Sequence, residues 1–167
     1  SRDDQPNWPP SAWLEGIVFG PQQRVSVEEL RALLPAGTPV RFYPDITHTM
    51  NCQYPVPRWD YAFQATLNRE PINPRPLDQA AIFRRVQPAN DHGVLTYSEG
   101  CNDDVNKCIW SMLAWEPEAD LRRILVDYSR YFIGGGTAES FAEGLLALER
   151  NWRGPLATNA GVGVTLA

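Results

Sequence analysis

The sequence has little lysine, little cysteine and no long apolar run, and each shortage argues against a class of protein. Lys107 is the only lysine among 167 residues, and the net charge at pH 7 is -5. Such a chain offers no cluster of cations for phosphate groups, so no nucleic acid partner is expected. Apolar runs such as residues 144–148 are far shorter than the roughly 20 residues that cross a bilayer, so no membrane contact is expected.

The cysteines and the first ten residues say less about the class of protein. Cys52, Cys101 and Cys108 are an odd number of thiols, so no disulfide framework is implied. Residues 1–10 are polar and rich in proline, without the apolar core of a signal peptide. The chain opens at Ser1 rather than Met, and removed upstream sequence stays an alternative.

Aromatic residues and proline are abundant. The sequence has six Trp, six Tyr, six Phe and fifteen Pro in a length that suits one globular domain. Flat side chains on rigid loops suit a ligand groove, although packing in the core is the commoner use of aromatic residues.

The order of apolar runs predicts alternating strands and helices. Residues 16–21, 39–43 and 93–97 are short apolar runs that are typical of buried parallel strands. Ser26 and Glu29 have the spacing of a capping box, which predicts a helix over residues 27–34.

Further helices are expected beyond the second strand. Asp78 is expected to cap a helix over residues 79–86, and Pro117 is expected at the first position of another. Helical spacing also favours helices from Asp103 and from Thr137, and the tail 154–167 is expected to be a packed extended strand.

This alternation indicates an α/β fold with parallel strands and right-handed crossovers. We expect a partial (β/α) barrel of about three strands in residues 1–100, with a helical region in residues 101–167 packed on it as one compact unit. A complete barrel takes roughly 250 residues. Further strands from upstream sequence or a companion chain, or else a small three-layer domain, are the alternatives.

Candidate catalytic residues follow two of the expected strands. Asp45 and Glu99 come just after neighbouring strands, and parallel α/β folds bind ligands at that edge. Adjacent strands lie roughly 5 Å apart, and glycoside hydrolysis needs two carboxyl groups about 5 to 9 Å apart. His48 is a third candidate, as an acid, a base or a hydrogen-bond partner of a sugar. Helix capping or pairing with arginine would explain either carboxylate alone.

Candidate sugar-binding residues lie in the polar segments 43–59 and 97–106 and in the proline-rich stretch between them. Aromatic rings there can stack on a pyranose, but they can also pack a long loop. Arg69 and Arg75 suit an acidic sugar or internal ion pairs, and Asn102 is adjacent to acidic residues that suit a helix N-terminus. The complete set is Tyr43, Tyr54, Trp59, Asp60, Arg69, Arg75, Asn102 and Asn106.

Residues 97–134 also carry a family resemblance. Trp110, the triplet 113–115, Pro117, the pair 119–120 and the stretch 131–134 resemble the phrase "W-x-x-L-A-W-x-P-x-A-D" and its "aromatic-F-x-G" ending. That phrase marks the helical region after the barrel in α-glucuronidase-like and some hexosaminidase-like glycoside hydrolases. The resemblance implies a glycosidase-like fold, a sugar-sized cleft and a periplasmic or extracellular location.

Three functions follow as hypotheses. The first is a glycoside hydrolase, or its C-terminal portion, that binds a carbohydrate and uses no cofactor. The second is a non-catalytic carbohydrate-binding or scaffold module derived from such a barrel. The third is a metal-assisted hydrolase that uses Asp45 and His48. No metal is expected, because the spacing of Asp45, His48 and Cys52 matches neither a CxxC nor an HExxH zinc motif.

Overall fold

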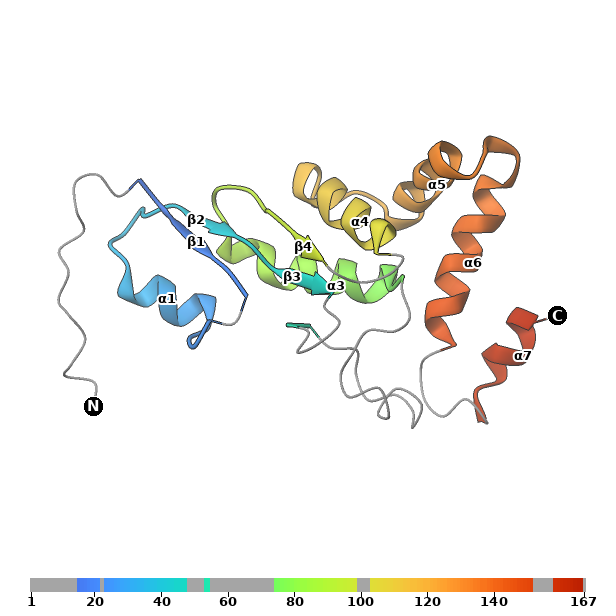
Figure 1. The fold of residues 1–167 in the computed structure, drawn as a ribbon, viewed down its shortest axis with the longest axis horizontal. Coiled ribbons are helices and arrows are strands. Elements are labelled where there is room, and N and C mark those ends of the chain that lie inside the picture. Colours follow the sequence, from blue (N-terminus) through green and yellow to red (C-terminus); the bar gives the residue numbers. More distant parts are fainter. Residues whose placement is uncertain are drawn as a thin grey trace.

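The computed structural model describes residues 15–21, 23–47, 53–54, 74–98, 103–151 and 158–166. Within them the chain is a mixed α/β structure with its strands toward one end and a group of helices at the other (Figure 1). This agrees with the expected α/β class and with the expected order of strands before helices.

The strands form two small parallel sheets. β1 (Ile17–Phe19) pairs with β2 (Val40–Phe42), and β3 (Asp45–Thr47) pairs with β4 (Tyr97–Ser98). A parallel bridge between Phe42 and Val94 links the sheets, and the N–H of Tyr97 donates to the carbonyl of Pro44 at 3.0 Å. β2 and β3 therefore act as one bent strand between β1 and residues 94–98. These three parallel segments lie side by side in the same order as in the sequence. No closed barrel is formed by the residues that the structure describes.

Helix α1 (Val27–Leu33) covers one face of the first sheet. Its capping box forms as expected, because Ser26 accepts the N–H of Glu29 and Glu29 accepts the N–H of Ser26. Val27 packs with Phe19, Val40 and Phe42 in a small core. Burial of these four side chains holds the helix on the sheet, since an isolated helix of this length would not be stable in water.

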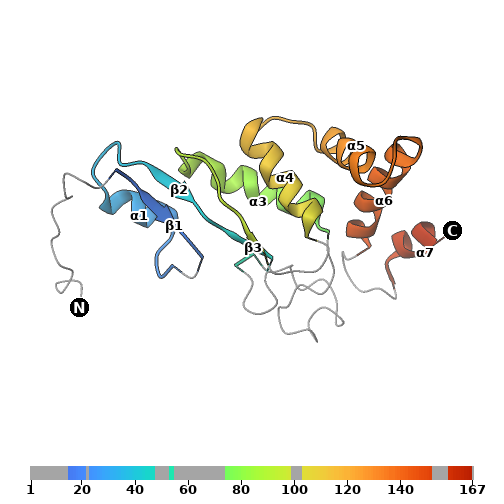
Figure 2. The ribbon, with the colours of Figure 1, turned by 45° about the horizontal axis from the view of Figure 1, so that its top comes forward.

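The larger core lies between β3 and the helices that follow. Ile46 packs with residues of α3 (Pro76–Val86) and α4 (Asp104–Trp115), and the rings of Phe83 and Trp110 meet edge to face at 5.3 Å. Gln79 is fully buried in α3, where it accepts the Trp110 N–H at 2.6 Å and donates to the Ile46 carbonyl at 3.1 Å. One amide thus connects β3 with α3 and α4, three elements that lie beside one another in Figure 2.

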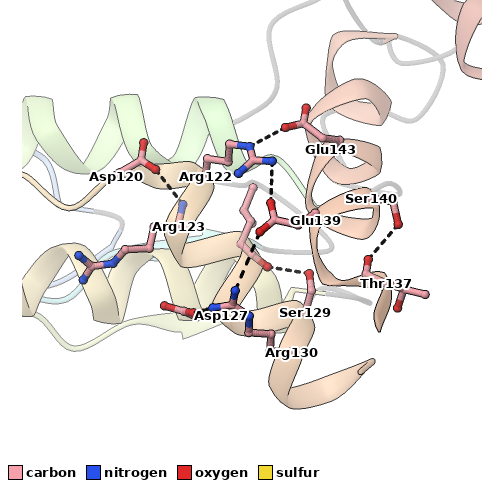
Figure 3. A network of polar contacts seen from close by, with 11 residues as sticks. Asp120, Arg122, Arg123, Asp127, Ser129, Arg130, Thr137, Glu139, Ser140 and Glu143 are labelled. Atoms are coloured by element: carbon pink, nitrogen blue, oxygen red, sulfur yellow. Dashed lines mark hydrogen bonds and ion pairs between the residues drawn. The ribbon is translucent and has the colours of Figure 1, made fainter. Parts of the chain in front are cut away.

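Helices α5 (Leu121–Phe132), α6 (Ala138–Arg150) and α7 (Ala160–Leu166) complete the helical end. The short 3-10 turn Gly135–Thr137 reverses the chain between α5 and α6. Arg122 of α5 bonds Glu139 at 2.6 Å and Glu143 at 2.7 Å on α6 (Figure 3). These exposed ion pairs border the buried contact between the two helices and add little to it.

Three sequence-based expectations for the helices are wrong. α3 begins at Pro76, and the carboxylate that accepts its first N–H groups belongs to Glu149 rather than Asp78. α5 begins after Asp120, whose side chain accepts the Arg123 N–H, so Pro117 lies in the preceding turn. The tail contains helix α7 where an extended strand is expected. No described helix is long and apolar enough to cross a membrane.

Candidate functional site

The ends of β3 and β4 bring the two polar segments of the sequence together. Asp45 pairs with Tyr97, and Thr47 pairs with Ser98 in parallel register. The next residues in the sequence are His48 and Glu99, so the points where these segments leave the sheet are neighbours. Ligands of parallel α/β proteins bind beyond this edge of the sheet.

An aromatic pair lies beside that edge. Side chains alternate along β2, with Val40 and Phe42 packed toward α1, so Arg41 and Tyr43 belong to the opposite face. The rings of Tyr43 and Tyr97 meet edge to face with centroids 6.4 Å apart. Both side chains are half-buried, so part of each ring is accessible on this face.

Asp45 lies inside the strand rather than beyond it. The sequence predicts a strand end at Tyr43, but the chain continues through Pro44 into β3, and Asp45 is its first residue. Asp45 is 3 % exposed, and its backbone N–H donates to Gln53 Oε1 at 2.9 Å. Asp45 pairs with Tyr97 of β4, and the register of the two strands shifts between Asp45 and Thr47.

Ser98 adds a buried hydroxyl at the end of β4. In the described part of the chain its Oγ atom has no hydrogen-bond partner. A buried hydroxyl without a hydrogen-bond partner costs free energy. We therefore expect a polar group to bind the Ser98 hydroxyl at this edge.

Tyr54 lies close to this edge and packs inward. Its ring stands 6.5 Å from that of Trp110, and its hydroxyl accepts a long hydrogen bond of 3.4 Å from Gln53. Burial raises the pKa of Tyr54 to about 12, so its hydroxyl stays protonated at neutral pH. This side chain is therefore a donor.

Arg75 has an internal role in the structure. The residue is 3 % exposed, and its guanidinium forms an ion pair with Asp78 and donates to the Tyr54 carbonyl at 2.7 Å. Its backbone N–H donates to Asn106 Oδ1 at 3.0 Å, and Asn106 is fully buried. Of the two sequence-based interpretations of Arg75, the structure matches the internal ion pair. Asn106 lies in the interior, where it anchors the start of α3.

A pocket of about 470 Å³ opens between α1 and α3. Its walls include Glu28, Gln53, Tyr54 and Arg85. Of these, only Tyr54 is among the residues expected from the sequence. Glu28 and Arg85 are far apart in the chain and belong to no motif, so only the packing of the two helices brings them together.

The remaining candidates fall outside the described residues. No group of three or more metal-binding side chains gathers within the described ranges, and the zinc alternative also needs His48 and Cys52, which lie outside them. The same is true of the other expected site residues, which are Trp59, Asp60, Arg69, Glu99 and Asn102.

Comparison with known proteins identifies no family. No protein-family model, no curated protein and no solved structure matches the chain.

Proposed function

We propose that this chain is carbohydrate-active and is a glycoside hydrolase or its C-terminal portion. The observation that carries the proposal is the parallel register of Thr47 with Ser98, because it joins the segments that begin with His48 and Glu99 to one edge of the sheet. The Tyr43 and Tyr97 rings beside this edge supply apolar surface of the kind on which a pyranose stacks.

The proposed chemistry uses two carboxyl groups with different proton states. One carboxyl is protonated and gives its proton to the glycosidic oxygen, while the other is ionised and acts as a nucleophile or activates water. Glu99 and Asp45 are the candidates for these roles, and His48 is a further candidate for proton transfer.

A second candidate function is a non-catalytic carbohydrate-binding module. The burial of Asp45 inside β3 favours it, because a residue that is 3 % exposed has little access to a substrate. In this function the aromatic pair would bind the sugar, and the carboxyl groups would serve the fold.

One set of variants separates the two functions. Oligosaccharides and aryl glycosides are tested for hydrolysis, and binding is measured separately by calorimetry. For a hydrolase, Glu99→Gln and Asp45→Asn each lower kcat by at least about a hundredfold with little change in binding, because general acid-base and nucleophilic groups act in the transition state. Glu118→Gln, an exposed glutamate between α4 and α5, is the matched control and keeps full activity.

The aromatic pair provides an independent readout. Tyr43→Ala is expected to weaken glycan binding about tenfold under either function, because it removes half of the stacking surface. Binding without any turnover in the unmodified protein supports the module. If none of the tested oligosaccharides and aryl glycosides is bound or hydrolysed, both carbohydrate functions are wrong.

A further inference from the structure

A pocket lies on the helical side of the sheet, between α1 and α3. β1 stops at Phe19, opposite Phe42, while the neighbouring strand runs on into β3. Phe19 and Phe42 line this pocket of about 470 Å³ together with residues of α1 and α3. Its volume falls within the roughly 300–1,000 Å³ that is usual for small-molecule sites.

Two opposite charges line this pocket from different helices. Glu28 belongs to the first turn of α1, and Arg85 belongs to the last turn of α3. Within the described part of the chain, neither side chain forms a hydrogen bond or an ion pair. Other arginines on these helices are engaged, since Arg31 pairs with Asp91 and Arg84 donates to the Ala119 carbonyl at 3.2 Å.

Both charges act on the phenol of Tyr54. Arg85 lowers and Glu28 raises the pKa of that hydroxyl, but burial outweighs both and keeps it protonated. The Tyr54 oxygen accepts a bond from Gln53, and its own hydrogen has no acceptor among the described residues. A neutral O–H donor therefore lies in the same pocket as a cation and an anion.

We propose that this pocket binds a small zwitterion of the α-amino acid class. The ligand carboxylate is held by Arg85 and by the Tyr54 hydroxyl, and the ligand ammonium is held by Glu28. A guanidinium and a hydroxyl are both donors to a carboxylate, and a carboxylate is the natural acceptor for an ammonium group. Val25 and Val86 in the pocket wall contact the ligand side chain.

Glu28 and Arg85 lie outside the proposed glycan site, although Gln53 and Tyr54 in the pocket wall adjoin it. Tyr43 lies on the opposite face of the sheet from α1, whereas Glu28 and Arg85 belong to the helices. The zwitterion proposal and the glycosidase proposal therefore succeed or fail separately.

Calorimetry with matched probes tests the charge pattern. Glycine, L-leucine, L-phenylalanine and L-glutamine are titrated into the full chain at up to millimolar concentration. We expect at least one to bind saturably and take L-leucine as the example. Its analogues 4-methylpentanoate and isoamylamine, which each lack one charge, are then expected to bind at least about tenfold more weakly, because each loses one charge-assisted contact.

Variants test the assigned residues. Arg85→Gln and Glu28→Gln are each expected to weaken amino acid binding at least about tenfold. Arg24→Gln and Glu118→Gln remove the same charges from exposed positions outside the pocket and leave binding unchanged. The double exchange of Glu28→Arg with Arg85→Glu restores binding that each single exchange abolishes. Circular dichroism checks that every variant is folded.

Several results would overturn the proposal. One is the lack of saturable binding by all four amino acids. Another is binding that survives unchanged in Arg85→Gln and Glu28→Gln. A third is a single-charge analogue that binds as tightly as its parent, because the pocket would then recognise only one of the two charges.

Discussion

Glu149 Oε1 in α6 accepts the backbone N–H of Asp78 in α3 at 2.8 Å, across 71 residues of sequence. Glu149 Oε2 accepts the neighbouring N–H of Leu77 at 2.5 Å. The first N–H groups of a helix have no partner within it, and Pro76 already removes one of them. A glutamate that is 1 % exposed therefore completes α3 and holds α6 against it.

Replacing Glu149 is expected to destabilise the chain. Glu149→Ala leaves the N–H groups of Leu77 and Asp78 without their acceptor and opens a cavity, which costs about 2–4 kcal/mol. Glu149→Gln keeps one acceptor oxygen and is expected to cost less. Urea denaturation followed by far-UV circular dichroism measures both free energies of unfolding.

Glu118→Ala is the control for this experiment, because it removes an exposed glutamate at the turn between α4 and α5. It is expected to leave the urea midpoint unchanged. If Glu149→Ala were no more destabilising than this control, the capping role of Glu149 would be wrong.

The same carboxyl is expected to make stability depend on pH. Burial raises the pKa of Glu149 above its ordinary value of 4.5, and it outweighs the two N–H donors, which lower the pKa. The folded chain then holds this proton at pH values where the unfolded chain has released it. The stability that Glu149 contributes therefore falls as pH rises from below 4.5 through the folded pKa.

Comparison with Glu149→Gln isolates this effect, because glutamine does not titrate. Unfolding free energies of both proteins are measured between acid and neutral pH. The unmodified chain is expected to lose stability relative to the variant as pH rises. A relative gain over that range would mean that the folded pKa is lowered, contrary to the burial argument.

The glycine turn between α5 and α6 offers a matched pair of substitutions. Gly134 has φ +142°, a backbone conformation that side chains rarely adopt, whereas Gly136 has no positive φ and open space within 4 Å of the position that a Cβ atom would take. Gly134→Ala is expected to cost about 1–3 kcal/mol through strain. Gly136→Ala is expected to be neutral or to stabilise by about 0.4–1 kcal/mol, since it restricts the unfolded chain.

Thermal unfolding of the two alanine variants measures this difference directly. Equal effects at both positions would contradict the assignment of the strained conformation to Gly134.

Local signals predicted the elements that depend on near neighbours. The capping box of Ser26 and Glu29 predicted α1 to within one residue of its observed end, because both partners lie in the same turn. The short apolar runs predicted parallel segments in the right order, since each run is bounded by glycine, proline or polar residues. For Arg75, the alternative of an internal ion pair is the one that matches the structure, and its partner Asp78 is only three residues away.

Distant partners could not be found in this way. Asp78 has the type and position of a cap, yet Glu149 fills that role, because the packing of α6 decides which carboxylate reaches the N-terminus of α3. The sequence predicted that Asp45 follows the end of a strand. In the structure the N–H groups of Leu95 and Tyr97 donate to the carbonyls of Phe42 and Pro44, so the strand pairing continues to Asp45. Pocket residues Glu28 and Arg85 carry no sequence signal at all.

The sequence alone determined the α/β class and the capping of α1, because apolar spacing and capping act over a few residues. Only the tertiary structure decided that Asp45 is buried, that Glu149 caps α3, and that Glu28 and Arg85 share a pocket. These features depend on contacts between helices and strands that are tens of residues apart in the sequence. The packing of Ile46, Phe83 and Trp110 in one core determines those contacts.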